Sequence, residues 1–208
     1  MLHQSTGKGA QGWFRRQLAD RDARNSANRL AYQADLLQPY LHRQSRVLDV
    51  GCGNGLLAAQ LRQTTGCTVV GMDVADLRAV DGDFLLFDGA RFPFPNASVD
   101  FVLLSFVLHH SRDPFALGQE ALRVARRGIF VFEDIPATRA QHALLAAHIV
   151  FFSWLYGISL PATLPWDCSY IDALSILQSS GHTHVTNLPA TRFKQMYPMS
   201  RQLYVCML

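Results

Sequence analysis

The residues best suited to chemistry lie in one short stretch, D-V-G-C-G-N-G, from Asp49 to Gly55. Glycine adopts left-handed backbone conformations freely, and it has no side chain to keep a ligand away from the backbone. The apolar residues at 47, 48 and 50 predict a short buried strand, and the helix-forming LLAAQLRQ follows the glycines. A turn between a strand and a helix presents free N–H groups to a ligand. We therefore predict a ligand-binding turn, whose third glycine comes one residue too early for the dinucleotide pattern G-x-G-x-x-G.

A second carboxylate, Asp73, ends the next predicted strand, 24 residues after Asp49. A carboxylate at this place can accept hydrogen bonds from both hydroxyls of a ribose. The alternative is an ordinary aspartate at a strand end, which caps the following helix. Because Asp73 occurs together with the glycine turn, the ribose role is favoured.

Two histidines, His109 and His110, follow a predicted strand over residues 99–104. A histidine at the mouth of a site can take a proton from a hydroxyl or an acidic carbon, and we expect this role for His110. Equally, either ring can cap or pack against a bound ligand. Glu133 and Asp134 end another predicted strand, where they either orient a substrate or cap the next helix. The chain has no H-x-E motif and no paired carboxylates typical of a metal centre, so no metal site is expected.

Strands and helices alternate along the middle of the chain, which predicts a doubly wound parallel sheet. A helical pattern over residues 14–41 precedes the first strand, and further strands are expected at 84–87 and 128–136. Gly66 ends the first helix after the glycine turn. Asp113 is a good N-cap and Pro114 a favoured first residue for the helix that follows the histidines.

These motifs together resemble the class I S-adenosylmethionine-dependent methyltransferases, in particular the small "type 11" methyltransferase domains. The first motif of that family is D-x-G-x-G-x-G, and RFPFP and VDFV match its "LPF" loop and "FDxV" strand. A longer match to the family's "LHHVxDPxxxLxExxRV" comprises Leu108, His109, His110, Asp113, Pro114, Leu117, Glu120, Arg123 and Val124. The sequence departs from the family after this helix, where ARRG replaces a proline and two glycines and leaves only Gly128 to form the turn.

The resemblance implies a seven-stranded, mostly parallel, Rossmann-like sheet with an antiparallel last strand. It also implies S-adenosylmethionine as the cofactor, with the glycine turn around its amino-acid end and Asp88 at the exocyclic amine of adenine. The residues expected at the cofactor are Asp49, Gly51, Cys52, Gly53, Gly55, Asp73, Val74, Asp88, Gly89 and Ser105.

Composition limits the class of protein. With 208 residues, 49% hydrophobic and 17% charged, the chain is large enough for one well-buried core. Its four cysteines are widely spaced, which favours reduced thiols, and its first residues lack the apolar core of a signal peptide. We therefore expect a cytoplasmic protein. The arginines between residues 15 and 43 could form a basic face for RNA, but without interleaved aromatic residues a solvated helix face is favoured.

The segment from His142 to Leu160 is almost uncharged and nearly long enough to span a membrane. Four polar or glycine interruptions argue against insertion in lipid, at His142, His148, Ser153 and Gly157. We expect a lid helix or helix pair that places Phe151, Trp154 and Tyr156 along an apolar acceptor pocket. A dimer contact is an alternative, and contact with a membrane surface is a minority interpretation.

The sequence thus predicts one methyltransferase domain over residues 1–208. Its expected parts are a helical cover (1–45), a cofactor-binding core (46–134), an apolar insertion (137–168) and a C-terminal helix with two strands (169–208). The expected reaction is methyl transfer to a small apolar or aromatic acceptor by a monomer or homodimer. The alternatives are an RNA methyltransferase, which the absent N-P-P-[FY] motif disfavours, and an NAD-type oxidoreductase. The sequence leaves the acceptor molecule and atom open.

Overall fold

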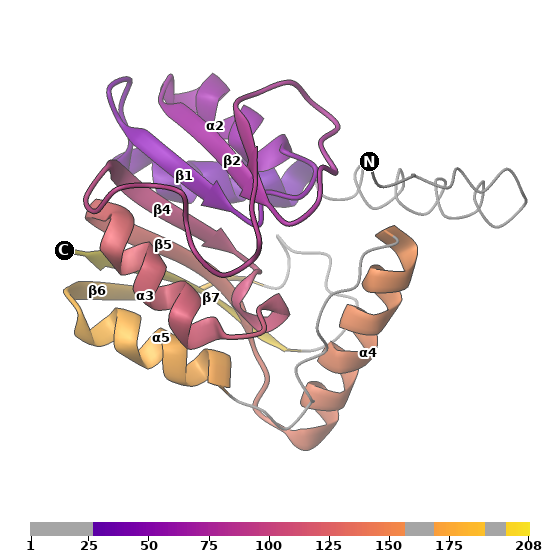
Figure 1. Ribbon diagram of the computed structural model, residues 1–208. Coiled ribbons are helices and arrows are strands. Elements are labelled where there is room, and N and C mark those ends of the chain that lie inside the picture. The colour runs from indigo at the N-terminus through magenta and orange to yellow at the C-terminus, as the bar shows by residue number, and fades with distance from the viewer. Residues whose placement is uncertain (1–26, 157–168, 190–198) are drawn as a thin grey trace, which may run out of the picture.

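The computed structural model describes residues 27–156, 169–189 and 199–208. The part of the predicted helical cover before residue 27, and the part of the apolar insertion after residue 156, lie outside these residues. Figure 1 shows one twisted sheet with helices on both faces, and a long helix, α4, that stands beside the sheet.

The sheet of the described residues has seven strands in the order β3-β2-β1-β4-β5-β7-β6. Their bounds are β1 Arg46–Val50, β2 Thr68–Asp73, β3 Phe84–Leu86, β4 Val99–Ser105, β5 Ala125–Ile135, β6 His182–Asn187 and β7 Ser200–Met207. The pairs from β3 to β5 are parallel, and β7 runs antiparallel to both β5 and β6. The predicted fold class is therefore confirmed. In such a sheet, ligands bind at the carboxyl ends of the strands where the strand order reverses, here between β1 and β4.

The helices begin and end where local signals place them. A helix covers residues 27–37, followed by η1 Gln38–Tyr40, α2 Leu56–Thr65, η2 Leu108–His110, α3 Pro114–Val124, α4 Arg139–Tyr156 and α5 Ser169–Ser179. The Asp113 side chain accepts a hydrogen bond from the Ala116 N–H at 2.9 Å, and Pro114 is the first residue of α3. Gly66 ends α2 in a left-handed conformation with φ 72°. These caps confirm the predicted helix boundaries.

The core lies on both faces of the sheet, because alternate strand residues point to opposite sides. In β1, Leu48 and Val50 face the layer of α3, α4 and α5, whereas Val47 faces the layer of α2 and helix 27–37. The central strands are buried on both faces, and the burial of all of Phe101 to Leu104 shows this for β4. A strand buried on both sides needs a continuous apolar run, as this sequence has.

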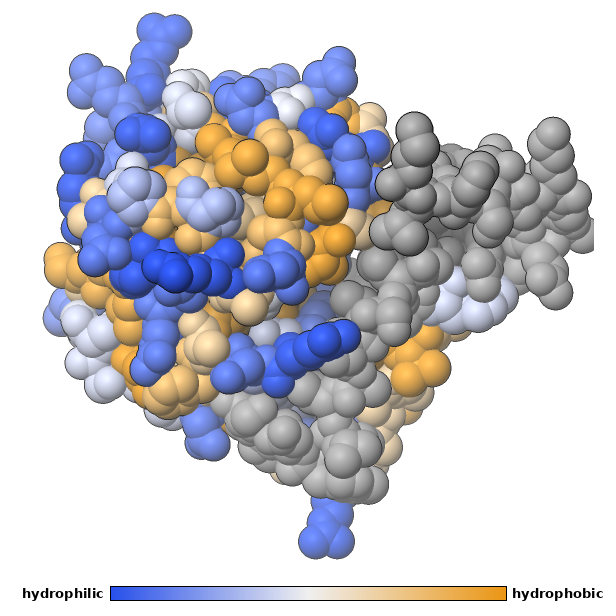
Figure 2. Space-filling model, viewed as in Figure 1, coloured by the Kyte–Doolittle hydropathy of each residue, from blue (hydrophilic) through white to orange (hydrophobic). Residues whose placement is uncertain are grey.

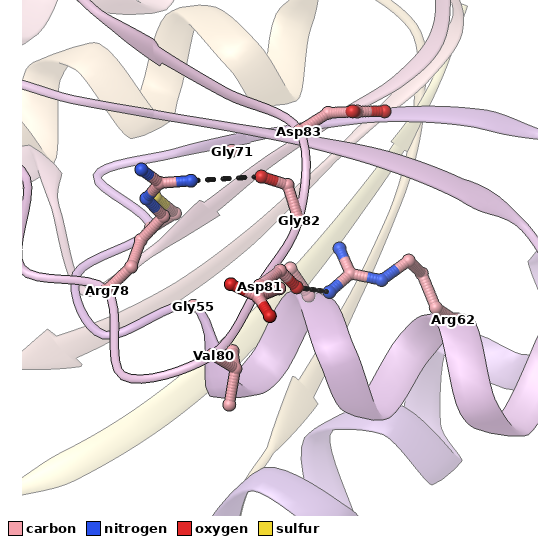
Figure 3. A pocket seen from close by; sticks show the side chains of 10 residues that line it. Gly55, Arg62, Gly71, Arg78, Val80, Asp81, Gly82 and Asp83 are labelled. Carbon is pink, nitrogen blue, oxygen red and sulfur yellow. Dashed lines mark hydrogen bonds between the residues drawn. The ribbon is translucent and has the colours of Figure 1, made fainter.

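The connection between β2 and β3, residues 74–83, contains no helix. Two arginines hold it instead: Arg62 of α2 donates to the Asp81 carbonyl and Arg78 to the Gly82 carbonyl, both at 3.0 Å. Figure 3 shows these two bonds across a small hollow between the loop and α2. The Arg62 guanidinium therefore fixes the loop against α2, and that of Arg78, itself a loop residue, closes the loop on itself.

Strand β5 corrects one sequence prediction. It begins at Ala125, directly after α3, and not after a turn at Gly128. Because ARRG lacks the family's proline, its N–H groups can join the sheet, and Arg126 forms an ion pair with Asp100. Gly128 lies inside the strand, where a Cβ atom would come within 2.7 Å of the Cys206 carbonyl oxygen.

Helix α4 has one buried face and one exposed apolar face. Leu145 and Ile149 are buried in the core, whereas Phe151 and Trp154 are 40% and 44% exposed and contact each other. At 100° per residue the two pairs point to nearly opposite sides of the helix. Figure 2 shows hydrophobic residues on the visible part of α4. No helix in the part of the chain described here is long and apolar enough to cross a membrane.

Candidate active site

The glycine turn after β1 adopts the backbone conformation that its sequence requires. Gly51, Gly53 and Gly55 all have left-handed φ angles, from 51° to 75°, a region that other residues rarely adopt. A Cβ atom on Gly51 would lie 2.5 Å from Val107 Cγ2. The turn therefore touches the segment that follows β4, which carries the two histidines. This contact joins the two halves of the site.

Asp73 fastens the turn to the end of β2. One of its carboxylate oxygens accepts the Gly53 N–H at 2.8 Å, and the other accepts the Val74 N–H at 2.7 Å. The second oxygen also accepts the Ala75 N–H at 3.4 Å, so the lone pair that remains for a ligand lies on the oxygen bound by Gly53. Burial raises the pKa of Asp73, against the effect of these N–H donors. The helix-capping alternative does not apply, because residues 74–83 contain no helix.

Asp49 is a buried carboxyl group with an oxygen that makes no hydrogen bond in the described structure. Its residue is 1% exposed and its Oδ2 atom has no partner. Burial, and then the charge of Asp73, raises the pKa of Asp49 to about 7. An unsatisfied buried carboxyl group is costly to keep, so it marks a place where a ligand donor fits.

The other residues predicted at the cofactor border the turn. Val74 is exposed and lies against Gly89, where a Cβ atom would be 3.2 Å from Val74 Cγ1. Asp88 is exposed and accepts the N–H groups of Ala90 and Arg91 at 2.9 and 3.2 Å. Val74, which follows the end of β2, and Gly89, which comes after β3, therefore lie next to each other and form one edge of the site.

Cys52 and Ser105 lie at the turn and at the end of β4. Burial, with the charges of Asp49 and Asp73, raises the pKa of the Cys52 thiol to about 12, so this thiol stays protonated. The Ser105 hydroxyl accepts a hydrogen bond from the buried Gln33 amide at 2.9 Å. Gln33 thereby fixes helix 27–37 at the carboxyl end of β4.

The two histidines have different surroundings. His109 is fully enclosed, and its Nδ1 pairs with the Glu133 carboxylate, which is also buried. Although burial lowers it, the charge and hydrogen bond of Glu133 raise the pKa of His109 overall. The ring of its neighbour His110 lies 4.2 Å away between centroids, tilted by 46°, and its Nδ1 atom has no hydrogen-bond partner in the described structure. Burial, His109 and His148 hold the pKa of His110 well below its usual value.

Sequence reasoning missed the partners of these groups. Glu133 and Asp134 neither cap a helix nor lie free at a strand end: Glu133 pairs with His109, and Asp134 accepts the Arg201 Nε–H at 2.5 Å. Tyr170 of α5 donates to the Asp134 carbonyl oxygen at 3.0 Å. The only local signal was that Glu133 and Asp134 are charged at the end of an apolar strand.

Helix 27–37 and α4 each contribute a basic side chain to this region. Arg29 lies over the Phe106 ring, 5.8 Å from its centroid, and Arg201 lies 5.2 Å from the same centroid. Phe106 has a left-handed φ of 57°, unusual for a residue with a side chain. His148 projects from the inward side of α4, where burial and then His109 lower its pKa to about 4.

Glu120 and Arg123, both part of the family match, hold a loop and lie apart from this site. Glu120 accepts the Phe92 N–H at 2.8 Å, and Arg123 donates to the Phe94 carbonyl oxygen at 2.8 Å. The pair itself is joined at 2.6 Å. These residues are thus structural, because they anchor the RFPFP segment to α3. Within residues 27–156, 169–189 and 199–208, no group of three or more histidine, cysteine or acidic side chains could hold a metal ion.

Comparison with known proteins agrees with this geometry. Residues 48–132 match the family model of the methyltransferase domain. An uncharacterized methyltransferase of Mycobacterium sp. (strain KMS) is 40% identical over 89 residues, which cover 39% of this chain and 35% of that protein. The 27-O-demethylrifamycin SV methyltransferase of Amycolatopsis mediterranei (strain S699) is 32% identical over 101 residues, covering 42% and 37%. The match thus spans about a third of the length of these relatives.

Solved structures show the same fold at low identity. The plantazolicin methyltransferase BpumL in complex with SAH superposes with a TM-score of 0.61 at 11% identity, covering 98% of this chain and 93% of that one. A SAM-dependent methyltransferase from Aquifex aeolicus gives a TM-score of 0.58 at 16% identity, covering 91% and 98%.

The sheet order, with its antiparallel β7 and its glycine turn at the switch point, defines the class I methyltransferase fold. Residues 48–132 are similar to a methyltransferase domain, which confirms the resemblance seen in the sequence.

Proposed function

We propose that this protein transfers a methyl group from S-adenosylmethionine to a small-molecule acceptor. The observation that carries the proposal is the buried, unpartnered Oδ2 of Asp49 beside three left-handed glycines. An acid held in this way fits the positively charged amino-acid end of the cofactor. When bound, S-adenosylmethionine supplies a methyl group activated by its sulfonium, so the protein mainly has to align the acceptor and exclude water.

Each cofactor residue has a proposed role that suits its surroundings. Asp49 and the turn of Gly51, Cys52, Gly53 and Gly55 receive the amino-acid end. Asp73 accepts the ribose hydroxyls, one through the free lone pair of Oδ2 and the other in place of the long Ala75 N–H bond at Oδ1. The edge formed by Val74, Asp88 and Gly89 receives adenine, and Ser105 borders the cofactor from the end of β4.

The acceptor side is proposed to be the segment that follows β4. Val107 touches the glycine turn, so residues 106–110 lie beside the place where the methyl group is carried. His109 is a positioning residue in this proposal, because Glu133 fixes its ring. His110 is the proposed contact to the acceptor, because its Nδ1 has no hydrogen-bond partner in the described structure.

The proposal gives the apolar insertion a different contact with the acceptor from the one that its sequence predicts. Phe151 and Trp154 are 40% and 44% exposed on α4, and their lining of an acceptor pocket stays a prediction. The side chain of Tyr156 lies outside the described residues. His148, on the inward side of α4, is the side chain through which this helix borders the acceptor.

A small-molecule acceptor is favoured over RNA. One similar protein is named a 27-O-demethylrifamycin SV methyltransferase. Another, the plantazolicin methyltransferase BpumL, has a structure in complex with a monoazolic desmethylPZN analog and SAH. The arginines at residues 15–24, on which the RNA alternative largely depends, lie outside the described residues. An NAD-type oxidoreductase gains no support from the comparisons.

The test is calorimetry with S-adenosylhomocysteine, the demethylated product. Replacing Asp73 by asparagine removes charge from hydrogen bonds worth about 1.5–3 kcal/mol each, so we expect affinity to fall at least about tenfold. Asp172→Asn in α5, exposed and remote from the turn, is the matched control and should bind normally. If the wild-type protein does not bind S-adenosylhomocysteine, the proposed function is wrong.

A further inference from the structure

The loop between β2 and β3, residues 74–83, contributes no buried residue to the core. Each of its residues is exposed or half-buried, whereas the connections from β1 to β2 and from β4 to β5 contain the helices α2 and α3. Parallel strands are normally joined by a dozen or more residues that include a helix. Because this shorter loop has no buried apolar side chains, polar contacts have to hold it in place.

The loop contacts the glycine turn at two points. Its Ala79 N–H donates to the carbonyl oxygen of Asn54, a residue of the turn, at 2.9 Å. Val80 lies next to the turn as well, since a Cβ atom on Gly55 would be 3.3 Å from Val80 Cγ2. The loop also begins directly after Asp73, whose carboxylate binds the turn. It therefore connects the acid proposed for the ribose with the turn proposed for the amino-acid end of the cofactor.

One side chain, that of Arg78, ties the two arms of the loop together. Its Nε and one terminal nitrogen donate to the two carboxylate oxygens of Asp76, each at 2.8 Å. The other terminal nitrogen donates to the Gly82 carbonyl oxygen at 3.0 Å, as Figure 3 shows. The guanidinium also lies over the Phe84 ring of β3, 4.5 Å from its centroid. A planar group with donors on several sides makes all of these contacts at once, which an ammonium group cannot do.

These contacts suit the holding of a loop better than the stabilisation of the whole fold. The side chains of Arg78 and Asp76 are 33% and 50% exposed, and an exposed ion pair adds little to the free energy of unfolding. The opening of a surface loop, however, has a free energy near zero, so a small contribution decides whether the loop is closed or open. Hydrogen bonds from Arg78 lower the pKa of Asp76 to about 2, and the pair therefore stays charged at neutral pH.

We propose that Arg78 is a positioning residue for the cofactor: it keeps loop 74–83 closed before the cofactor binds, and the closed loop holds the glycine turn in its binding conformation. This proposal rests on the proposed function. The guanidinium makes its contacts within the loop and with β3, so it acts on the turn through Ala79 and Val80. When only a fraction of the molecules is competent to bind, the apparent affinity falls in proportion to that fraction.

Calorimetry with S-adenosylhomocysteine tests the consequence for binding. Arg78→Gln should weaken the affinity about three- to tenfold, as the closed loop falls to between about a third and a tenth of the molecules. The binding entropy should become less favourable, because the ligand then has to order the loop. Arg78→Lys should retain part of the affinity, since an ammonium group still pairs with Asp76. Arg139→Gln, at an exposed arginine at the start of α4, is the matched control and should bind normally.

Hydrogen exchange of the Ala79 amide, followed by NMR, separates positioning from general destabilisation. In the free wild-type protein this N–H should be protected, because it is bonded to Asn54. In free Arg78→Gln it should exchange faster, by about the same factor as the loss of affinity, and S-adenosylhomocysteine should restore its protection. The amides of β1 should keep their wild-type rates in both states.

Unchanged affinity in Arg78→Gln, or an Ala79 amide as well protected as in the wild type, overturns the proposal. A loss of protection that is equal in the Ala79 amide and in β1 also overturns it, because the variant is then destabilised as a whole. If the wild-type protein does not bind S-adenosylhomocysteine, the proposed function fails, and with it the role of Arg78 toward the cofactor. The exchange rates of the free protein still show in that case whether Arg78 closes the loop, so the two failures are distinguishable.

Discussion

The two ends of the site are built in different ways. The part of the cofactor end proposed for the amino acid and the ribose consists of backbone conformation and two acids, all within one short turn and the end of the next strand. The acceptor end is assembled from side chains of helix 27–37, the segment 106–110 after β4, β5, α4 and β7. Its ion pairs join residues 24 and 67 positions apart. The cofactor end therefore depends on local geometry, and the acceptor end on the packing of distant elements.

This difference predicts separate consequences of mutation at the two ends. A change in the buried pairs of the acceptor end should cost folding stability and leave cofactor binding intact. A change in the turn should affect cofactor binding directly. The predictions below test that separation.

The largest effect is expected for Glu133→Ala. This change leaves His109 buried without its carboxylate, and breaking a buried pair by removing one partner costs about 3–5 kcal/mol of unfolding free energy. Denaturant unfolding at pH 6 measures it, with Glu120→Ala as a control in a partly exposed pair. Folded Glu133→Ala protein should still bind S-adenosylhomocysteine within about twofold of wild type.

The pH dependence of that pair follows from the direction of the shift. The pKa of His109 is raised in the folded protein above its unfolded value of 6.5. The stabilisation by the charged pair is therefore complete below pH 6.5 and is lost as the pH rises through the folded pKa. The difference in stability between wild type and Glu133→Ala should shrink over this range. A difference that grows with pH would contradict the assignment.

The contrast between the ends also explains what could be predicted from the sequence. The turn at Gly51, the carboxylate of Asp73 and the cap at Asp113 were recognisable because each acts on residues near it in the sequence. The pairing of Asp134 with Arg201 was not, because it depends on β7 lying antiparallel to β5. The start of β5 at Ala125 was missed because the family's turn, and not the free N–H groups of ARRG, guided the expectation.

The next effect concerns the contact between the two ends, Gly51 with Val107. Gly51→Ala would place a Cβ atom 2.5 Å from Val107 Cγ2 in a left-handed backbone conformation. Strain of about 1–2 kcal/mol and overpacking of about 1–3 kcal/mol should add. Gly53→Ala is the matched control, because its φ is also left-handed but its Cβ would meet no atom within 4 Å. Unfolding experiments should show the smaller loss for Gly53→Ala.

A double variant isolates the steric part of this effect. Adding Val107→Ala to Gly51→Ala removes the Cγ2 contact at 2.5 Å, and leaves the Cβ contact at 3.0 Å and the backbone strain. We expect the double variant to recover affinity for S-adenosylhomocysteine toward that of Gly53→Ala. If the effects of the two changes on affinity are additive, the contact between Gly51 and Val107 does not limit cofactor binding at the turn.

A smaller effect is expected for the pH dependence of cofactor binding. The pKa of Asp49 is about 7, far above the 3.8 of an exposed aspartate, so the folded protein retains this proton as the pH rises from 4 to 7. The unfolded chain loses the same proton near pH 4, so stability falls as the pH rises from about 4 to about 7 and levels off above 7. Binding of the cofactor's cationic end should release the proton. Affinity for S-adenosylmethionine should then be about tenfold weaker at pH 6 than on the plateau above 7.

Calorimetry at pH 6.5 in two buffers with different heats of ionisation checks the released proton directly. Asp49→Asn keeps the size of the side chain but cannot titrate, so its affinity should be weak and nearly constant across this range. Proton release that persists in Asp49→Asn would assign it to another group, and the role given to Asp49 would be wrong.

The smallest effect on the folded monomer is expected for Trp154→Ser. Trp154 is 44% exposed on the side of α4 away from Leu145 and Ile149, and its described ring contact is Phe151. Removing a partly exposed side chain that lies outside the core should change the unfolding free energy by less than about 0.5–1 kcal/mol and leave affinity for S-adenosylhomocysteine unchanged. Leu145→Ala, on the buried face of the same helix, should cost about 2–5 kcal/mol because it leaves a cavity. Denaturant unfolding of both variants compares the two faces of one helix.

If Trp154→Ser is as destabilising as Leu145→Ala, the outward face is covered in solution. Light scattering of the wild-type protein across a concentration series then shows whether a second copy provides that cover, since an apolar face buried in a dimer would make stability depend on concentration.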